Sequence, residues 1–543
     1  MTVSIRSLGK LAAALCCVSL LGLQPMAAHA ETPVQGGTLS YYQDLEPDDW
    51  NLTHLWPTSL LVLGGNVVDR LVYFGDDGAY HPWLAKSWEV SEDGKEYTFH
   101  LRDDVTFHNG EKFDAHAVAA NMDAWQNDPN TSTLIAAGIS GYEVIDDYTV
   151  KLIFSRVSAQ GMWVISVPAF GFLAPEAVTT HYNDLSADPT KMIGTGPFKI
   201  TGYTRGQGLT MERNPDYAWA PEQAPNQGPA HLDRIEVSFA PDPTVRLGVL
   251  NSGQADLIAN VPALFVPQIE AAANTAVWEQ KSPGLPYHLD LNVQKPPLDD
   301  QRVRAALRAS FDLPSALQSI YFGKREQAWT ALSPATPLAG AYNETLEGKW
   351  SFDPDEAARL LDEAGWTERD AEGYRVKDGQ RLSLHWTVRA SLVEDQRDVL
   401  AEALISMARD AGIELKRVPV DSGVYEQQMQ TGDYHLTDRT MTTPDVYILR
   451  RSFASDMLPD EGVNYSRVTL PEVDAVVDPL ISSSDNALRA EMARKLQEMD
   501  FENVWEIPLY VRSTFFGSTD RVQGLSFDNS GWLGSFHSAW LAP

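Results

Sequence analysis

Apolar and polar positions alternate with a two-residue period in several short stretches of the chain. TLSYY at 38–42, YTFHL at 97–101 and YTVKLIF at 148–154 show this pattern, which is typical of half-buried β-strands. Other stretches, such as residues 115–125, read as helices instead. No fixed-period repeat is visible. The sequence therefore predicts a mixed α/β fold in which short strands and helices alternate.

One helix is predicted by its end signals as well as by its period. In SFDPDEAARLLDEAGW, Asp353 is the expected N-cap, Pro354 fits the first helical position and Glu356 completes a capping box. Gly365 is expected just after the helix end. A second helix is expected within DDQRVRAALRASF at 299–311. Both should face the core, and we assign them no chemical role.

The first thirty residues have the three zones of a secretory signal peptide. Arg6 and Lys10 precede an apolar stretch from about 11 to 23, and Ala28-His29-Ala30 forms a small-x-small cleavage site. This apolar stretch is shorter than the roughly 20 residues that a membrane span needs. We therefore expect residues 1–30 to be removed near Ala30, which leaves a soluble chain in the periplasm.

Composition narrows the classes of function. The 543 residues carry a formal net charge of −32, so the surface repels nucleic acid. Both cysteines, Cys16 and Cys17, lie in the predicted signal, so disulfides cannot hold the mature fold. Leu15 precedes Cys16, whereas lipoprotein processing prefers a small residue there; lipid anchoring stays a minor alternative. The length and a hydrophobic content of 43% imply at least two lobes.

Residues 84–118, LAKSWEVSEDGKEYTFHLRDDVTFHNGEKFDAHAV, resemble a run found in the family 5 extracytoplasmic solute-binding proteins, the peptide, nickel and opine receptors of ABC importers. GTGPFKI at 194–200, NPDYAW at 214–219 and LNVQKPPLDDQRVRAAL from 291 follow in the family's order. The resemblance spans nearly the whole mature chain. It implies an α/β fold with two lobes, the type II periplasmic binding protein fold, with an extra subdomain in the first lobe.

The same resemblance implies how the chain is divided. A crossing strand between lobes is expected at Tyr287 to Asn292 and a return near Ile507 to Arg512, and two crossings make a hinge that closes on a ligand. The expected parts are lobe 1 at 31–286, with a core at 31–75 and 195–286 and an inserted subdomain at 76–194, lobe 2 at 287–511, and a return to lobe 1 at 512–543.

Arg389 is the first candidate for holding a ligand. In dipeptide-binding members an arginine shortly after a strand binds the ligand carboxylate, and Arg389 in LHWTVRAS stands at the matching place. The planar guanidinium suits a carboxylate because it makes two parallel hydrogen bonds. The alternative for Arg389 is an ordinary surface arginine. Thr440 or Thr442 replaces the acid that binds the ligand's amino group, which disfavours simple peptides because a buried ammonium would stay unpaired.

Further candidates for ligand contact come from the same loop and from aromatic side chains. The second choices from the loop are Arg439, Asp445, Tyr447 and Arg450. The aromatic candidates for the cleft are Tyr42, Trp56, Phe170, Phe172 and Trp386. For each of these aromatic residues, a place in the core is the alternative.

The nickel-binding branch of the family is the other close comparison. The Arg439-Thr440 pair resembles its sequence, but Gly171 stands where that branch has an arginine that contacts a metal chelate. The histidines are dispersed, with no metal-type spacing. The sequence therefore predicts no metal site and no cofactor.

Complete catalytic signatures are missing from the sequence. G-x-S-x-G is absent, and Ser484-Asp485-Asn486 matches one element of the penicillin-binding enzymes without its partners. We therefore expect no catalytic residues, with an exported enzyme on the same fold as the alternative of another class.

The predicted protein is a monomeric substrate-binding component of an ABC import system. It captures a small carboxylate-bearing solute, such as a modified peptide, an opine or a similar conjugate, and delivers it to a permease and ATPase complex. A receptor for nickel, another metal chelate or an oligopeptide is the alternative within the family.

Overall fold

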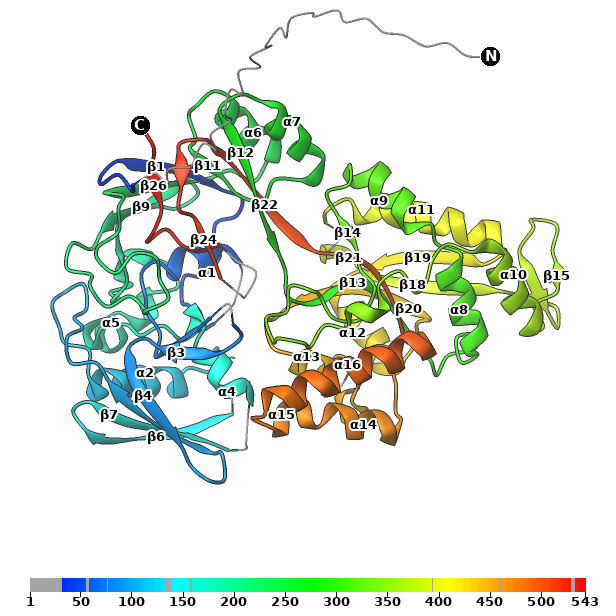
Figure 1. The fold of residues 1–543 in the computed structure, drawn as a ribbon, viewed down its shortest axis with the longest axis horizontal. Helices are drawn as coiled ribbons and strands as arrows, with labels where there is room; N and C mark the ends of the chain where they lie inside the picture. The colour runs from blue at the N-terminus through cyan, green and yellow to red at the C-terminus, as the bar shows by residue number, and fades with distance from the viewer. Residues whose placement is uncertain are drawn as a thin grey trace, which may run out of the picture. The chain divides into compact units, whose positions relative to one another are not determined.

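Two large β-sheets organise the chain in the computed structural model (Figure 1). The structure describes residues 32–54, 58–75, 77–131, 138–155, 159–392, 394–459, 461–528 and 533–543. The predicted signal peptide and Trp56 lie outside the described residues. The part of the chain from Val34 to Pro543 belongs to one compact unit.

The first large sheet has seven strands in the order β12-β22-β11-β1-β10-β9-β8. β1 is parallel to β10 and β11, whereas the outer pairs are antiparallel. In β1, Leu39 and Tyr41 are buried while their neighbours are more exposed, as the alternating pattern predicts. The bounds are β1 (Thr38–Gln43), β8 (Phe198–Thr204), β9 (Gly208–Arg213), β10 (Arg234–Phe239), β11 (Leu257–Ile258), β12 (Thr275–Lys281) and β22 (Ser513–Thr519).

The second large sheet has six strands in the order β14-β21-β13-β20-β18-β19. β18 is parallel to both β19 and β20, so these strands end at the same edge of the sheet. Every residue of β13 is buried, since both of its faces are covered. The bounds are β13 (Gly284–Leu291), β14 (Glu326–Gln327), β18 (Ser383–Arg389), β19 (Glu414–Val420), β20 (Leu436–Thr442) and β21 (Glu506–Val511).

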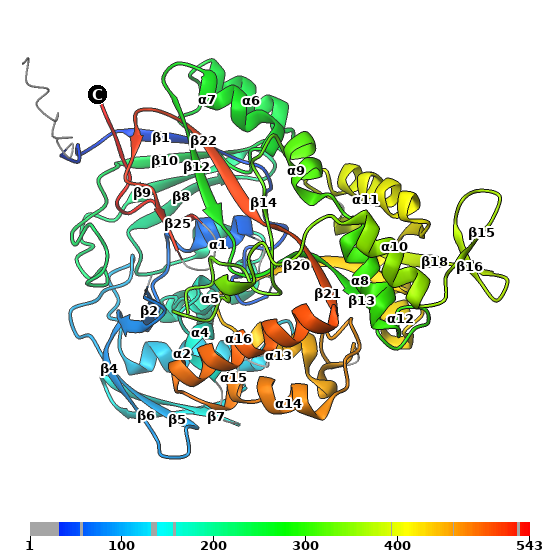
Figure 2. The same cartoon turned by 45° about the vertical axis from the view of Figure 1, so that its right-hand side comes forward.

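Two short connections join the large sheets. β12 and β22 are antiparallel neighbours in the first sheet, and β13 and β21 are antiparallel neighbours in the second. Residues 282–283 link β12 to β13, and Arg512 alone links β21 to β22. Figures 1 and 2 show the two paths running side by side.

A four-stranded antiparallel sheet forms a separate layer in the first half of the chain, in the order β4-β5-β7-β6. The predicted strands at 97–101 and 148–154 correspond to β5 and β7, and the helix expected at 115–125 is α2, whose N-cap Asp114 accepts a hydrogen bond from the Ala117 amide. The bounds are β4 (Ala85–Val90), β5 (Glu96–Leu101), β6 (Ile139–Asp146), β7 (Thr149–Phe154) and α2 (Ala115–Asn127).

The remaining helices and short strands cover the sheets. The helices are α1 (Thr58–Gly64), α4 (Ala159–Val164), α5 (Pro175–Thr180), α6 (Pro243–Asn251), α7 (Val266–Ala271), α8 (Gln301–Ala309), α9 (Leu313–Tyr321), α10 (Pro354–Glu363), α11 (Arg397–Ala411), α12 (Ser422–Thr431), α13 (Tyr447–Phe453), α14 (Pro471–Val477), α15 (Pro479–Ser482) and α16 (Asn486–Asn503). The short strands are β2 (Val72–Phe74), β3 (Tyr80–Pro82), β15 (Glu368–Arg369), β16 (Arg375–Lys377), β17 (Gln380–Arg381), β23 (Val522–Gln523), β24 (Ser526–Phe527), β25 (Leu533–Ser535) and β26 (Trp540–Leu541).

The predicted ends of α10 are confirmed, apart from half of the capping box. The Asp353 side chain accepts a hydrogen bond from the Glu356 amide at 2.9 Å, and Gly365 has a left-handed φ of +88°. The Glu356 carboxylate, however, pairs with Arg359, and the Asp353 amide donates to the Ala309 carbonyl at 2.8 Å. The packing of α10 against α8 therefore supplies the partner that the capping box was expected to supply.

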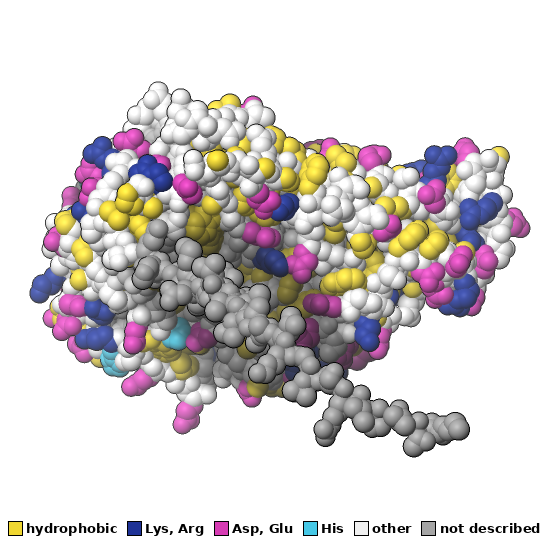
Figure 3. All heavy atoms as spheres, turned by 45° about the horizontal axis from the view of Figure 1, so that its top comes forward, with side chains coloured by type: hydrophobic (Ala, Val, Ile, Leu, Met, Phe, Trp, Pro, Cys, Tyr) yellow, Lys and Arg dark blue, Asp and Glu magenta, His cyan; other side chains and the backbone are white. Residues whose placement is uncertain are grey.

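The surface mixes charged and apolar side chains. On the face drawn in Figure 3, acidic, basic and apolar groups lie next to one another. In the described part of the chain, every helix is too short or too polar to cross a membrane.

Candidate functional site

Two pockets lie next to each other where the connections between the large sheets reach the second sheet. Both include Glu394 and Arg512 in their walls. The arginine pocket has a volume of about 540 Å³ and is lined by Val388, Arg389, Glu394, Arg397, Tyr425, Asp438, Arg439, Thr440, Met441, Thr442, Val463, Tyr465 and Arg512. The crossing pocket has a volume of about 460 Å³ and lies beside residues 512–515, between segments that belong to the two large sheets.

Arg389 lies at the last position of β18, at the edge where the parallel strands end. One of its Nη atoms donates a hydrogen bond to the Glu426 carboxylate at 3.3 Å, and its guanidinium carbon lies 4.8 Å from the centre of the Tyr425 ring. Its Nε is buried and has no hydrogen-bond partner among the described residues. A buried N–H without a partner is costly, so the geometry favours an incoming acceptor such as a carboxylate.

Arg439 enters the same pocket from β20 and is held more tightly. Its Nε and Nη2 donate to the two oxygens of Asp290 at 2.8 and 2.9 Å. Burial lowers the pKa of Arg439, but the Asp290 carboxylate raises it further, so the net shift is upward. Arg439 is thus a fixed positive charge in the pocket wall, and most of its hydrogen-bonding capacity is already used.

Arg397 and Arg512 complete the positive wall. The guanidinium carbon of Arg397 lies 4.4 Å from the centre of the Tyr287 ring, and its Nη2 lies 3.4 Å from Glu394. Arg512, in the link between β21 and β22, lies 3.9 Å from the same carboxylate. Glu394 therefore stands between two arginines at the rim of the pocket.

Arginines outnumber carboxylates in the lining of the arginine pocket. Four arginines line it, against the carboxylates of Glu394 and Asp438, while Glu426 and Asp290 outside the lining pair with Arg389 and Arg439. Asp438 is occupied, since it accepts hydrogen bonds from the Tyr287 hydroxyl at 2.6 Å and the Trp386 indole at 2.8 Å. In a chain with a net charge of −32, this pocket is a local cluster of guanidinium groups that can bind an anionic group.

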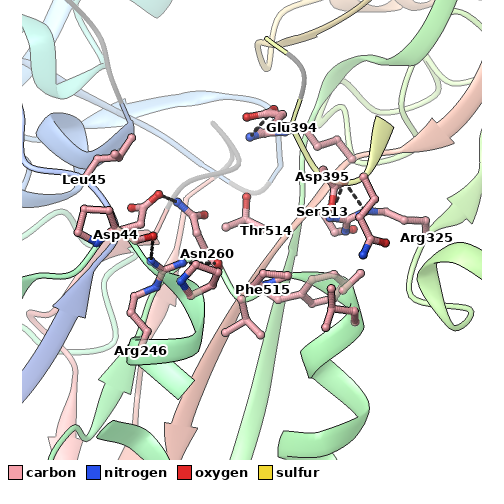
Figure 4. A pocket seen from close by; sticks show the side chains of 18 residues that line it. Asp44, Leu45, Arg246, Asn260, Arg325, Glu394, Asp395, Ser513, Thr514 and Phe515 are labelled. Atoms are coloured by element: carbon pink, nitrogen blue, oxygen red, sulfur yellow. Dashed lines mark hydrogen bonds and ion pairs between the residues drawn. The ribbon is translucent and has the colours of Figure 1, made fainter. Parts of the chain in front are cut away.

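The charges of the crossing pocket are paired internally (Figure 4). Arg325 binds both oxygens of Asp395 at 3.0 Å. Arg246 donates to four backbone carbonyls, and Asn260 donates to Asp44 at 2.6 Å. This pocket offers a mainly apolar space next to the arginine pocket rather than a second charged anchor.

The loop candidates from the sequence do not all reach the arginine pocket. Asp445 is buried and bonded to Arg489 at 2.5 Å, and Tyr447 packs 6.3 Å from Trp163, ring centre to ring centre. Arg450 pairs with Asp456 at 2.8 Å. None of the three lines either pocket. Their direct contact with a ligand stays a prediction.

The aromatic candidates are mostly part of the packed interior. Phe170 and Phe172 lie in the core of the four-stranded layer, with ring centres 4.9 and 5.6 Å from that of Trp125. Trp386 is fully buried, and Tyr42, on β1 of the first sheet, packs partly buried against a core cluster that includes Leu250 and Ile258. Their contact with a ligand likewise stays a prediction.

The structure places the predicted candidates Arg389 and Arg439 in the arginine pocket, together with Arg397, Arg512 and Tyr425, which the sequence did not single out. Arg397 begins α11, Tyr425 lies on α12 and Arg512 links β21 to β22, and the packing of these elements around the second sheet brings them to one pocket. The position of Arg512 next to a predicted lobe crossing was the one local signal available.

Comparison with known proteins agrees with this architecture. Residues 79–447, more than half of the chain, match the family described as bacterial extracellular solute-binding proteins, family 5, middle region. The nickel-binding periplasmic protein of Escherichia coli (strain K12) is 27% identical, over 82% of this chain and 83% of the relative. The dipeptide-binding protein of the same organism is 25% identical, over 94% of this chain and 96% of the relative.

Among solved structures, NikA from Brucella suis in complex with Fe(III)-EDTA superposes with a TM-score of 0.80 and 26% identity, covering 93% of this chain and 100% of that chain. The fold is therefore that of the two-lobed periplasmic binding proteins, as predicted. The chain belongs to family 5 of the bacterial extracellular solute-binding proteins. The relatives named here are binding proteins rather than enzymes, and they do not agree on one ligand.

Proposed function

We propose that this chain is the substrate-binding component of an ABC import system and that the arginine pocket receives the acidic end of a small solute. The observation that carries the proposal is the excess of arginines over carboxylates in a pocket of a strongly acidic chain. Arg389 is the primary anchor because its Nε lacks a partner among the described residues, whereas Asp290 already holds Arg439.

The preferred solute is a carboxylate-bearing conjugate such as a modified peptide or an opine. The side chains that replace the expected amine anchor, Thr440 and Thr442, both line the pocket, and a threonine cannot neutralise an ammonium group. The nearby Asp438 carboxylate is already occupied by Tyr287 and Trp386. A free α-amino group would therefore find no free carboxylate at this position.

Closure and delivery are part of the same proposal. The two adjacent connections between the large sheets form the hinge, and the solute is returned unchanged to the permease and ATPase complex. Residues 1–30 direct export to the periplasm and are removed near Ala30, and the mature chain acts as a monomer. Peptide sequencing of the exported protein's N-terminus tests the cleavage site.

A binding experiment tests the function. Mass spectrometry identifies the small molecules that copurify with the mature protein, and a thermal-shift panel compares opines, capped peptides, free dipeptides and nickel complexes. A true ligand at a hundredfold excess over Kd stabilises the protein by about 2.7 kcal/mol. Arg389→Ala should weaken its binding by about 2–5 kcal/mol. Arg359→Ala, on the exposed side of α10, serves as the control and should leave Kd unchanged.

Three outcomes would contradict the proposal. An unchanged Kd in Arg389→Ala removes this arginine from the site. Chemical conversion of the solute by the purified protein supports an enzyme on this fold instead. If only nickel complexes bind, the metal-chelate receptor is the better function, since an anionic chelate also suits a positive pocket and a relative is a nickel-binding protein.

A further inference from the structure

Three ionisable side chains meet inside the second sheet, outside the lining of both pockets. His288 and Asp290 are two residues apart on β13, so they point to the same face. The antiparallel register with β21 places Glu506 opposite Asp290. The His288 Nε2 lies 3.4 Å from an Asp290 oxygen and 3.4 Å from a Glu506 oxygen. All three side chains are 0% exposed.

The hydrogen bond on the other side of the ring fixes the tautomer of His288. Its Nδ1 lies 2.7 Å from the Pro286 carbonyl oxygen. A carbonyl only accepts, so Nδ1 carries the hydrogen and Nε2 of the neutral ring presents a lone pair. Neither this Nε2 nor either oxygen of Glu506 has a hydrogen-bond partner among the described residues. Arg439 supplies one positive charge here, since it pairs with Asp290 and its Nη2 lies 3.7 Å from a Glu506 oxygen. With both carboxylates ionised, one negative charge is left over, and a second positive charge beside the His288 Nε2 would balance it.

Distances favour a metal ion over a proton as that charge. A charge-assisted hydrogen bond would draw the nitrogen and an oxygen to about 2.7–2.9 Å. Ligands about 2.0–2.2 Å from a tetrahedral zinc ion are instead about 3.3–3.5 Å apart. Both separations from the His288 Nε2 are 3.4 Å, which matches the tetrahedral arrangement.

The surroundings also fit a metal site. A ligating histidine typically donates its other N–H to a backbone carbonyl, as His288 does to Pro286, and a ligating carboxylate is typically held by an outer partner, as Asp290 is by Arg439.

We propose that His288 Nε2, Asp290 Oδ2 and Glu506 Oε1 form a buried site for a divalent transition-metal ion, with zinc the best match to this mixture of nitrogen and oxygen ligands. A water molecule would take the fourth position. The metal would fasten β13 to β21, the two strands that lead into the connections between the large sheets. Its role is structural, because the full burial of its ligands excludes a substrate.

Sequence spacing could not indicate this site. His288 and Asp290 are separated by one residue, but Glu506 lies more than two hundred positions further along and has no histidine or cysteine near it. Only the register of the two antiparallel strands brings it to the others.

Metal analysis after refolding tests the proposal, since a buried ion exchanges slowly in the folded state. Untagged mature protein is unfolded with a chelator and refolded with or without one equivalent of Zn²⁺, then freed of excess metal by gel filtration. We expect one zinc ion per chain by mass spectrometry and a higher Tm in the zinc-loaded sample. Refolding with Co²⁺ should give the visible absorption of a tetrahedral cobalt site.

Matched variants locate the metal. His288→Gln and Glu506→Gln should lose the bound equivalent and the cobalt absorption. His385→Gln should keep both; its ring lies 5.5 Å from that of His435 in a more exposed position, the place where adventitious metal would bind. Arg389→Ala should also keep the metal, which separates this site from the solute pocket.

The proposal is overturned if refolded wild-type protein retains no zinc and gives no tetrahedral cobalt spectrum, in which case a proton holds the cluster together. It is equally overturned if both His288→Gln and Glu506→Gln keep a full equivalent. Should these variants fail to fold, the stoichiometry and cobalt spectrum of the wild-type protein decide the question alone.

Discussion

The Ser282 amide donates a hydrogen bond of 2.8 Å to the Arg512 carbonyl oxygen. Each of these residues lies in one of the two connections between the large sheets, so the hydrogen bond ties the connections to each other. A movement of one sheet relative to the other would therefore turn both connections together. This coupling is the geometry that a hinge needs.

Trp163 on α4 and Tyr447 on α13 link the four-stranded layer to the helices of the second sheet, with α4 also packed beside α15. If this contact belongs to the closed form, Trp163→Leu should weaken solute affinity about 2- to 10-fold, since such ring pairs contribute about 0.5–1.5 kcal/mol. Calorimetric titration measures Kd, and a double-mutant cycle with Tyr447→Leu should show non-additive effects. A lower Tm with unchanged Kd would contradict the prediction.

The ion pair between Asp445 and Arg489 should contribute strongly to stability. Both side chains are buried, at 7% and 8% exposed, and their contact is 2.5 Å. Arg489→Met would leave the Asp445 carboxylate buried without its partner, so the free energy of unfolding should fall by about 3–5 kcal/mol. Urea unfolding measures this change. Arg359→Met, which removes an exposed pair, is the comparison and should cost less than about 1 kcal/mol. Equal losses of unfolding free energy in the two variants would show that burial of the ion pair does not explain the loss.

His54 should make stability depend on pH near neutrality. Its two ring nitrogens contact Asp49 at 2.8 Å and Asp128 at 2.5 Å, and these carboxylates raise its pKa even though burial acts in the opposite direction. The stabilisation is present below the unfolded pKa of about 6.5 and is lost as pH rises through the higher folded pKa. The difference in unfolding free energy between wild type and His54→Asn should therefore shrink above pH about 6.5. A difference that is constant across this range would be inconsistent with the ion pairs.

Asp69 should make stability fall with rising pH as His54 does, but in a lower pH range. Burial raises its pKa to about 6, although Thr195 and Trp219 donate hydrogen bonds to its carboxylate at 2.9 and 3.0 Å. Because the folded state holds the proton more tightly than the unfolded state, the contribution of Asp69 to stability falls as pH rises from about 4 to about 6. Urea unfolding of wild type and Asp69→Asn at several pH values measures this. If the unfolding free energies of the two proteins change with pH in parallel, the raised pKa of Asp69 is ruled out.

Much of the fold could be predicted from the sequence because its signals are local. The alternation in β1, β5 and β7 reports strands with one buried face, and the Asp353 cap and Gly365 bound α10. These features depend on a few adjacent residues. These local features do not depend on how the elements pack together.

The candidate site could be predicted only in part, for a physical reason. Arg389 was found because it ends a strand in a recognisable motif, but Phe170 and Phe172 carry the same apolar signal whether they pack in a core or face a cleft. Arg397 and Arg512 reach the pocket only through the packing of α11 and of the β21–β22 link around the second sheet. Such long-range packing leaves no trace in the neighbouring sequence.

Arg512 forms the whole connection between β21 and β22 and also stands in the wall of the arginine pocket. On the proposed function, the residue whose backbone rotates during closure is the same one whose charge attracts the solute. A substitution at Arg512 would change both solute affinity and the rotation of the hinge, so Arg512 variants alone could not separate the two effects.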